Sequence, residues 1–498
     1  MDDIKVLILT ENIDKFSSDY PAEIKILTWD KKYLKSHDYI DILVLDRCID
    51  EEESQALFEI TRAYTVFYMD DLRLDGVTRR FINMRLGEVM SLDALKILIS
   101  LKGKDYYQQP YGEKANPKDI GIAQGFEGSI KWNGQYSVEL DGDYGSSFNQ
   151  IVFWKYNIPV SDGMSLDLWL EYTKDDSVEI LLEIRKFVGG SISDVSNIWT
   201  YNEIEMQDEI CIENDNIDGV LFVSLKARGK GKLSVIALHD RYSRRGIGEF
   251  MVGGERYVTS DREEIFAYFD PGDLKPPLAV YFSGYKTMEG FEGYYMMRKM
   301  GCPFLLIAEQ RFEGGGFYIG SKEYEDLMVE IINKYLSKLG FYPEQLILSG
   351  ISMGTIGSLY YGCDFRPHAL ILGKPLASLG DIALNERLNR PAGFPTSLDL
   401  LNHYADGMEE KHIDTLNNRV WNKIRDTDFG HTKFIVSYMF EDDYDRTAYD
   451  RLLSELNSAG VQVYGKGLHG RHNDNTAGIG AWFKGQYDRI LKEDFNRI

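Results

Sequence analysis

The stretch Gln345–Gly354 reads QLILSGISMG, and it decides how the C-terminal half of the chain folds. Its first half is an apolar run with the length of a buried strand. Its second half, GISMG, matches the GxSxG pattern of a nucleophile elbow, the tight turn between a strand and a helix. Small residues flank Ser352 because this turn is strained, and the turn exposes the hydroxyl near a helix N-terminus. The sequence therefore predicts that Ser352 is a nucleophile; an incidental serine in a glycine-rich turn is the alternative.

The sequence on both sides of this turn alternates apolar strands with amphipathic helices. Helical periodicity is found at Lys322–Leu339 and again at Arg446–Ala459. Strands that alternate with helices are typical of a doubly wound parallel sheet. We therefore predict an α/β-hydrolase-like catalytic domain over residues 246–498. Its predicted strands are Leu278–Ser283, Cys302–Ile307, Gln345–Ser349, Ala369–Leu372, Lys433–Phe440 and Val461–Gly465.

A serine hydroxyl needs a base, and this fold supplies one on the loop after its last strand, in the chain order Ser, acid, His. The segment after Val461–Gly465 reads GLHGRHND and contains His469 and His472. We prefer His472, because its place at the far end of the loop, just before Asn473, leaves it freer to reach the elbow. His469 remains the alternative.

The acid of such a triad is expected after the strand Lys433–Phe440. Three carboxylates follow it directly: Glu441, Asp442 and Asp443. One of them would accept the imidazole N–H and fix the tautomer of the histidine. We choose Asp442 and keep the other two as alternatives, since a run of acids at a strand end is otherwise a solvated turn.

An oxyanion hole needs two backbone donors. One is expected to be the N–H of Met353, which follows the nucleophile, and for the other we nominate the N–H of Tyr285, after the strand Leu278–Ser283. Ordinary turn chemistry explains the glycine before Tyr285 equally well. The segment Gln310–Tyr318 reads QRFEGGGFY, and its three glycines predict either a mobile loop beside the site or a plain surface loop.

The first part of the chain has the pattern of a small α/β domain, placed at residues 1–112. Apolar runs predict buried strands, and a stretch of helical periodicity lies between the last two. The segment TENIDKF after the first strand has no glycine, which excludes a dinucleotide-binding turn. Proline, glycine and polar residues at Tyr106–Asp119 indicate a linker. The predicted strands are Val6–Leu9, Ile42–Leu45 and Thr65–Tyr68, and the predicted helix is Glu51–Ala63.

Between these parts, residues 113–245 have the texture of a β-sandwich, with short alternating runs separated by Gly, Asp and Asn turns. Exposed tryptophans on such a domain would stack on sugars, so it is a candidate for carbohydrate binding. The alternative is that they fill the core. The predicted strands are Tyr136–Leu140, Ile151–Trp154, Ser165–Glu171 and Ser177–Arg185, and the tryptophans are Trp132, Trp154, Trp169 and Trp199.

The composition argues against several classes of function and location. The formal net charge is -23 and no basic cluster stands out, which argues against a nucleic-acid partner. The N-terminal MDDIKVLILT is neither a signal peptide nor a membrane span, so we expect a cytoplasmic protein. The four cysteines have no disulfide or zinc spacing and are expected to be buried thiols. No metal and no tightly bound cofactor is expected.

Four segments together resemble a known family: GISMG at 350–354, YFSGY at 281–285, QRFEGGGFYIGS at 310–321 and GLHGRHND at 467–474. They are similar to the second accessory secretory protein of the accessory Sec system of Gram-positive bacteria. The resemblance covers the whole chain. It maps the catalytic serine of that family to Ser352, its histidine to His472 and its acid to Asp442.

The resemblance also implies a function. Members of that family support export of serine-rich repeat glycoprotein adhesins and O-acetylate N-acetylglucosamine on them. They work in the cytoplasm or at the inner face of the membrane, with other accessory secretory proteins and the accessory export motor ATPase. The acetyl donor is unknown. A non-catalytic scaffold of the export complex and an unrelated esterase are the competing hypotheses, and the presence of serine, acid and histidine in order favours the enzyme.

Overall fold

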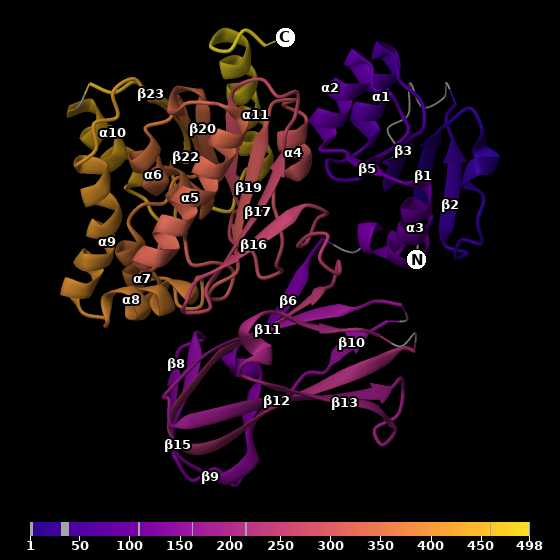
Figure 1. Ribbon diagram of the computed structural model, residues 1–498. Coiled ribbons are helices and arrows are strands. Elements are labelled where there is room, and N and C mark those ends of the chain that lie inside the picture. Colours follow the sequence, from indigo (N-terminus) through magenta and orange to yellow (C-terminus); the bar gives the residue numbers. More distant parts are fainter. Residues whose placement is uncertain are drawn as a thin grey trace.

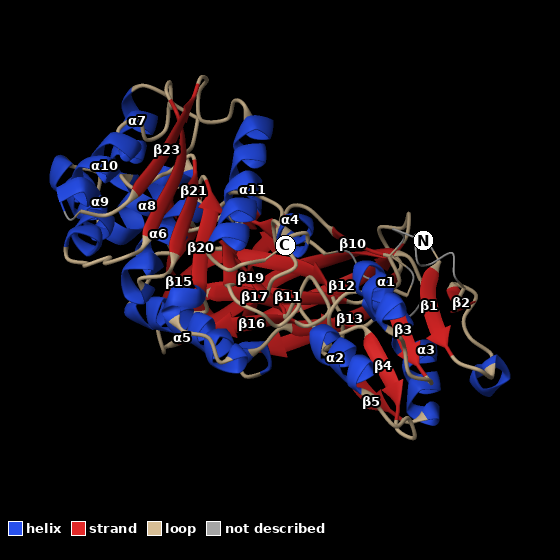
Figure 2. Cartoon of the chain, turned by 90° about the horizontal axis from the view of Figure 1, so that it is seen from above, coloured by secondary structure: helices blue, strands red, loops and turns tan. Residues whose placement is uncertain are grey.

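The computed structural model describes residues 3–30, 39–107, 110–161, 163–214, 217–458 and 460–497. The protein has a mixed α/β fold in which three sheets follow one another along the chain (Figure 1). We call them the N-terminal sheet (β1–β5, within residues 4–90), the middle sheet (β6–β15, within residues 112–242) and the C-terminal sheet (β16–β23, within residues 254–468). Seen from above, the N-terminal sheet lies at one end of the molecule and β20–β23 with their helices lie at the other (Figure 2).

The N-terminal sheet is parallel, with the strand order β2-β1-β3-β4-β5. The strand prediction at Ile42–Leu45 is confirmed, and the other two are each displaced at one or both ends. The first helix ends at Ile60, three residues earlier than predicted, because Thr61 is extended and its hydroxyl bonds back to Leu57 O. The elements are β1 (Ile4–Leu9), β2 (Ile24–Thr28), β3 (Ile42–Leu45), α1 (Glu51–Ile60), β4 (Val66–Met69), α2 (Gly76–Arg85), β5 (Glu88–Met90) and α3 (Leu92–Tyr107).

A buried ion pair joins this part to the C-terminal sheet. The guanidinium of Arg85, at the end of α2, lies 3.0 Å from Asp270 Oδ1, and both side chains are at most 1% exposed. The Arg85 guanidinium also lies 3.9 Å from the Phe58 ring centroid. Neither charge has access to water, so each depends on the other.

Removing Arg85 should therefore destabilise the protein strongly. We expect Arg85→Ala to lower the free energy of unfolding by about 3–5 kcal/mol, because Asp270 is left as an unpaired buried charge. Urea denaturation measures the loss. The exposed pair Arg228–Glu179 supplies the control, and Arg228→Ala should cost less than about 1 kcal/mol. Equal losses in the two variants would contradict this account.

The stretch expected to be a linker, Tyr106–Asp119, is structured wherever it is described. It contains the end of α3, then β6 (Gly112–Ala115) and a 3-10 helix at Pro117–Asp119. Residues 108–109 lie outside the described residues. The linker prediction was wrong because β6 is not a free segment: it pairs with the long strand β15 (Gly219–Tyr242) of the middle sheet.

The middle sheet is one ten-stranded sheet, not the two sheets of the predicted sandwich. The first half of β15 pairs with β12 and the second half pairs with β11, while β9 runs beside both halves. The pairing shifts at Gly229, where φ is +95° and a Cβ would lie 2.1 Å from Ser177 O. Such bulges bend a strand, which lets one sheet fold over its own core. The remaining strands are β7 (Ile120–Ile122), β8 (Ser129–Asn133), β9 (Ser137–Trp154), β10 (Ile158–Val160), β11 (Leu166–Lys174), β12 (Val178–Val188), β13 (Val195–Asn202) and β14 (Ile210–Ile212).

The four tryptophans of this region occupy different environments. Trp154 is 5% exposed and packs in the core of the middle sheet. Trp169 is 1% exposed and carries the Arg262 guanidinium 3.7 Å from its ring, so it is buried at the junction with the C-terminal sheet. Trp132 is 47% exposed and Trp199 is half-buried. The core interpretation is therefore confirmed for Trp154 and wrong for Trp132.

The C-terminal sheet has the strand order β16-β17-β19-β18-β20-β21-β22-β23. The six strands predicted from the sequence correspond to β18–β23 and pair in parallel, as expected, but β17, which was not predicted, is antiparallel to both of its neighbours. A tight turn at Thr259–Glu263 makes a hairpin of β16 and β17. The strands are β16 (Gly254–Val258), β17 (Glu264–Asp270), β18 (Leu278–Phe282), β19 (Phe304–Glu309), β20 (Leu346–Ile351), β21 (Ala369–Gly373), β22 (Lys433–Met439) and β23 (Val463–Leu468).

Helices pack on both faces of this sheet and bury a separate core on each side. Side chains of α5, α6 and the inserted helices α7–α9 fill one core, and those of α4 and α11 fill the other. The predicted helix Lys322–Leu339 is confirmed, and the one predicted at Arg446–Ala459 begins two residues later; Ala459 lies outside the described residues. The helices are α4 (Tyr294–Arg298), α5 (Lys322–Leu339), α6 (Gly354–Phe365), α7 (Leu379–Leu388), α8 (Thr396–Ala405), α9 (Glu410–Arg425), α10 (Ala448–Ser458) and α11 (Thr476–Glu493).

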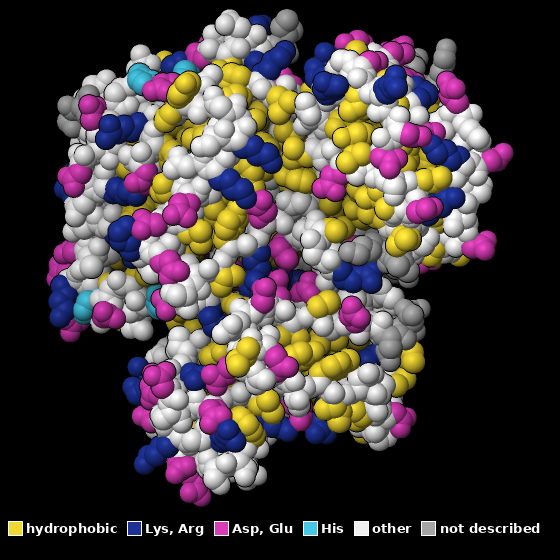
Figure 3. All heavy atoms as spheres, viewed as in Figure 1, with side chains coloured by type: hydrophobic (Ala, Val, Ile, Leu, Met, Phe, Trp, Pro, Cys, Tyr) yellow, Lys and Arg dark blue, Asp and Glu magenta, His cyan; other side chains and the backbone are white. Residues whose placement is uncertain are grey.

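The charged side chains on the surface agree with the absence of a basic cluster in the sequence. Acidic and basic side chains are interspersed over the face shown in Figure 3, and no extended basic patch is visible there. None of the helices in the described part of the chain combines the length and apolar character that a bilayer crossing needs. Cys302 and Cys363 are buried, but Cys48 is half-buried and Cys211 is exposed, so the expectation of four buried thiols was wrong for these two.

Candidate active site

The turn between β20 and α6 places Ser352 in a left-handed conformation, with φ of +56°. Two close approaches explain the glycines around it. A Cβ on Gly350 would lie 2.3 Å from the backbone of Gly354, and a Cβ on Gly354 would lie 2.1 Å from Phe282 O. Any larger residue at either position would force the backbone apart. The strained serine is held by its own N–H, which donates to Gly373 O at 2.8 Å.

Three predicted side chains meet at this turn. Ser352 Oγ lies 2.8 Å from His472 Nε2, and His472 Nδ1 lies 2.8 Å from Asp442 Oδ2. Asp442 follows β22, and His472 lies on the loop between β23 and α11. His472 and Asp442 are 3% and 7% exposed, so the hydrogen-bonded chain runs from the elbow into the protein. This is the geometry of a nucleophile, a base and an orienting acid.

The alternative residues lie elsewhere. The His469 side chain is 86% exposed, and its Nδ1 lies 3.1 Å from Glu441 Oε1, so the structure pairs these two with each other. Asp443 accepts the main-chain N–H of His472 at 3.0 Å and leaves the ring to Asp442. Among the described candidates, Asp442 and His472 are the acid and histidine that the fold brings to Ser352.

The surroundings of Asp442 favour the ionised form of its carboxylate. Burial alone would raise its pKa, but the hydrogen bond and charge of His472 act against burial. The N–H groups of Tyr444 and Asp445 donate to Asp442 Oδ1 at 2.9 and 3.2 Å. The net effect holds the pKa of Asp442 below its ordinary value, so the carboxylate remains an acceptor for the imidazole N–H.

One predicted oxyanion donor, Met353, belongs to the elbow, and the other, Tyr285, follows a glycine that lies beside it. Gly284, which precedes Tyr285, lies against Ile351, since a Cβ there would be 3.4 Å from Ile351 O. Neither the N–H of Tyr285 nor that of Met353 donates to another of the described residues. Both N–H groups therefore lack an acceptor among the described residues, as donors of an oxyanion hole must.

Comparison with known proteins places the chain in a family. The model of the family described as Asp2, accessory Sec system GspB-transporter, matches residues 6–497. The chain belongs to this family. The accessory Sec system protein Asp2 of Streptococcus gordonii is 42% identical over 435 residues, which are 87% of this chain and 85% of that protein. The Asp2 protein of Staphylococcus aureus is 39% identical over 388 residues, 78% of this chain and 74% of that protein.

A solved structure resembles this Asp2-family member over its whole length. It is a chain of the Glycosylation Associate Protein (Gap123) complex from Streptococcus agalactiae. The two chains are 37% identical, each is covered completely by the other, and the TM-score is 0.87. The order of the three sheets is therefore shared with a solved relative.

The glycine-rich segment Gln310–Tyr318 of this Asp2-family member is buried except for the half-buried Glu313, so the alternative of a plain surface loop was wrong. Arg311 is 3% exposed, and its guanidinium donates to Glu309, Glu263 and Ile319 O. The loop packs directly against the site. A Cβ on Gly314 would lie 2.3 Å from the Tyr285 ring, and one on Gly315 would lie 2.5 Å from Met353 Sδ.

A row of aromatic rings beside the triad was missed from the sequence. The Tyr444 ring lies 4.6 Å from the His472 ring and 5.7 Å from Phe394, which in turn lies 5.0 Å from Tyr285. Arg390 covers the Tyr444 ring at 4.0 Å. The aromatic row therefore runs from the oxyanion loop to the histidine. Its members come from separate loops, so no sequence motif marks them.

Two pockets of this Asp2-family member differ in volume and in their distance from the triad in the fold. A pocket of 640 Å³ is lined by Asp442, Tyr444 and Arg390, and so adjoins the candidate site. A larger pocket of 1200 Å³ lies between α1, α2 and α11 and contains none of the triad residues. The smaller pocket touches the triad at Asp442, and neither Ser352 nor His472 lines it.

Proposed function

We propose that this chain is a serine-dependent O-acyltransferase of the α/β-hydrolase type. The observation that carries the proposal is the continuous chain of 2.8 Å contacts from Ser352 Oγ through His472 to Asp442. His472 takes the proton of Ser352 as the hydroxyl attacks the carbonyl of an acyl donor. The N–H groups of Met353 and Tyr285 hold the developing oxyanion, and the donor's leaving group departs with the proton from His472.

The second half of the reaction decides between transfer and hydrolysis. An acceptor hydroxyl gives its proton to His472, attacks the acyl group on Ser352 and leaves as an ester, while Ser352 recovers its proton. Water reacts in the same way unless the acceptor excludes it. We propose that the acceptor is N-acetylglucosamine on a serine-rich repeat glycoprotein adhesin. Family membership supports this assignment, and the aromatic row supports it because aromatic rings pack against the apolar faces of sugars.

We also propose that the chain works with other accessory secretory proteins and the export motor ATPase at the cytoplasmic face of the membrane. The relative from Streptococcus agalactiae supports the first of these partners, since its structure is that of a Gap123 complex. In this proposal acyl transfer and export are separate roles. Acyl transfer needs the triad, and all three of its residues belong to this chain.

Covalent labelling with a fluorophosphonate tests the enzyme directly. The wild-type protein should be labelled at one site, and Ser352→Ala should not be labelled. Ser358→Ala is the matched control, because Ser358 is a buried serine of α6, the helix that follows Ser352, and its hydroxyl bonds to Gly354 O. In cells, the Ser352→Ala strain should export an adhesin that lacks O-acetyl groups. No labelling of folded wild-type protein would leave a scaffold as the better account.

The aromatic row predicts an effect on the acceptor alone. We expect Tyr444→Ala to raise KM for a sugar acceptor about 2- to 10-fold, the value of one ring contact, with hydrolysis of a small ester changed less. Tyr342→Ala is the control, because that tyrosine is 70% exposed and precedes β20, at the opposite end of that strand from Ser352. Equal effects on transfer and hydrolysis would show that Tyr444 supports the triad and not the acceptor.

A further inference from the structure

Charged side chains are buried where the middle sheet meets the C-terminal sheet. Arg241 of β15 is 2% exposed, and its guanidinium donates to Glu264 of β17 at 2.6 and 2.8 Å. Its Nε donates to Glu289 Oε2 at 2.7 Å. Glu289 is 1% exposed and lies on the loop between β18 and α4. Burying charged side chains between two sheets costs desolvation energy, which only close pairing with opposite charges can offset.

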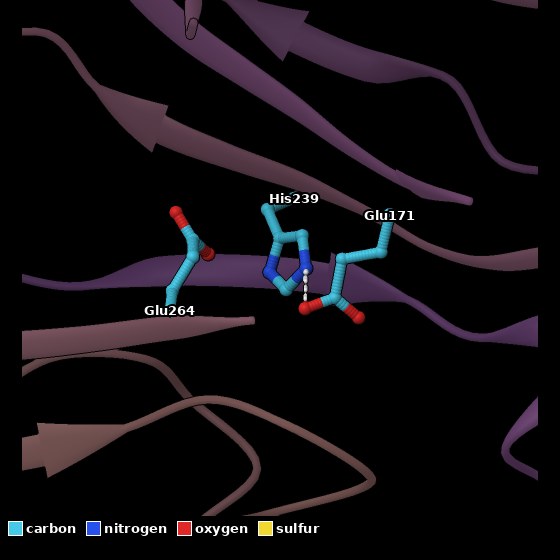
Figure 4. Close-up of side chains that lie close together, drawn as sticks. All are labelled: Glu171, His239 and Glu264. Carbon is cyan, nitrogen blue, oxygen red and sulfur yellow. Dashed lines mark ion pairs between the residues drawn. The ribbon is translucent and has the colours of Figure 1, made fainter. Parts of the chain in front are cut away.

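His239 lies at the centre of this junction, between Glu171 and Glu264 (Figure 4). Its Nδ1 lies 2.5 Å from Glu289 Oε1 and its Nε2 lies 3.5 Å from Glu171 Oε1. The three residues of Figure 4 are close enough to suggest a metal site. However, both oxygens of Glu264 already accept hydrogen bonds from Arg241, and Glu171 and Glu264 lie on opposite sides of the ring. The arrangement is therefore not a chelate.

The histidine acts as a buried cation instead. Burial would lower the pKa of His239, but the charges of Glu289 and Glu171 outweigh burial and raise it to about 9. A protonated ring between two carboxylates ties Glu171 of the middle sheet to Glu289 of the C-terminal part. Glu289 is thus held by two cations, His239 and Arg241, both on β15.

The main chain of Glu289 is fixed to the middle sheet as well. Its N–H donates to Gly112 O at 2.9 Å and its carbonyl accepts from Gly112 N at 3.3 Å, so the loop forms a bridge with β6. The next residue, Gly290, has φ of +126°, and a Cβ there would lie 2.5 Å from Pro110 O. The loop therefore cannot move away from β6 without breaking the main-chain bonds to Gly112 and the side-chain ion pairs of Glu289.

The same loop carries the proposed oxyanion donor. Gly284 N–H donates to Glu292 Oε2 at 2.6 Å, and Glu292 N–H donates to Ser283 Oγ at 3.2 Å, which closes the loop at its base. Tyr285 lies between this closure and Glu289. Tyr285 is thus four residues from Glu289 (289 − 285) on the same closed loop.

We propose that Glu289 and His239 are positioning residues of the active site: they hold the loop after β18 against the middle sheet and so place the Tyr285 N–H in the oxyanion hole. The proposal rests on the acyl-transfer function proposed above. It makes the middle sheet a part of the catalytic architecture.

Ester hydrolysis by the full chain tests this placement. With p-nitrophenyl acetate as the probe, Glu289→Gln and His239→Gln should each lower kcat about 10- to 100-fold. KM should stay within about two-fold, because the oxyanion contact is made in the transition state and not with the bound ester. End-point labelling with a fluorophosphonate counts the folded active sites, so kcat is expressed per competent site.

A buried charge pair at another junction provides the matched control. Asp270→Asn breaks the Arg85–Asp270 pair, which is as buried as the Glu289 pairs but does not touch the loop. It should lower the melting temperature as much as Glu289→Gln does and leave kcat per site unchanged. A purely structural role for Glu289 would give the two variants the same kcat.

The outcomes separate this proposal from the enzyme assignment. Values of kcat within two-fold of wild type in both loop variants would overturn the positioning role. If Glu289→Gln does not fold, His239→Gln decides, because it keeps Arg241 on Glu289. If wild-type protein neither labels nor hydrolyses esters, acyl transfer fails, and hydrogen exchange of residues 283–293 becomes the readout. Faster exchange there in His239→Gln supports the loop anchor, and unchanged exchange overturns it.

Discussion

Replacing His472 with alanine is expected to lower kcat for ester hydrolysis by about four to six orders of magnitude, the loss found when a triad histidine is removed. Ser352 Oγ has His472 Nε2 as its hydrogen-bond partner at 2.8 Å, and without that base the hydroxyl stays protonated. Steady-state kinetics with a nitrophenyl ester measure the change. Binding of the ester should be little affected, because the oxyanion loop and the aromatic row remain in place.

His469 provides the matched control for this prediction. It lies on the same loop, three residues earlier, but its ring is exposed and pairs with Glu441. His469→Ala should therefore keep kcat within about two-fold of wild type. The assignment would be wrong if His469→Ala lost activity while His472→Ala retained it.

Asp442→Asn is expected to lower kcat by about four orders of magnitude with little change in structure. The amide would present an N–H to His472 Nδ1, and the ring would then carry its proton on Nε2. That tautomer donates a hydrogen bond to Ser352 and cannot accept its proton. The wild-type carboxylate prevents this, since it accepts from Nδ1 at 2.8 Å.

The neighbouring carboxylates supply the controls. Glu441→Gln changes an exposed residue that pairs with His469, so its kcat should match wild type. Asp443→Asn keeps an oxygen that accepts the main-chain N–H of His472, so it should lose far less than Asp442→Asn. Comparable losses in Asp442→Asn and Asp443→Asn would mean that the whole turn, and not one acid, orients the imidazole.

The pKa of Asp442 fixes how acid should act on the folded protein. Because the pKa is lower in the folded chain than in the unfolded one, ionised Asp442 stabilises the fold above its unfolded pKa of about 3.9. That stabilisation is lost as pH falls through the lowered folded value. Near neutral pH the carboxylate is ionised throughout, so Asp442 sets no limb of the pH–rate profile there.

The elbow was predictable because its chemistry is local. Gly350 and Gly354 are required by contacts within a few residues of Ser352 or with the adjacent strand, and these requirements appear in the sequence as GxSxG. The order of serine, acid and histidine follows from the order of the strands. The choice of Asp442 among three adjacent acids did not follow, because it depends on which side chain faces His472 once β22 has ended.

Features that depend on distant partners could not be predicted. The bend of β15 at Gly229 turns two expected sheets into one, and it involves a contact with Ser177. Glu289 looks like any loop acid in the sequence, and its role depends on His239 and on Gly112, 50 and 177 residues away along the chain (289 − 239 and 289 − 112). No local pattern encodes such pairings.

The buried pairs between sheets have a consequence for the protein during its synthesis. Asp270 and Glu289 are synthesised after Arg85 and Arg241, so these ion pairs must wait for their acids, although Arg241 already has Glu209 as a partner. From Arg241 to Glu289 is 48 residues (289 − 241), or about 2 to 10 seconds of translation. During that interval the nascent middle sheet carries a cation that its finished form buries. The last sheet to be translated therefore completes the two that precede it.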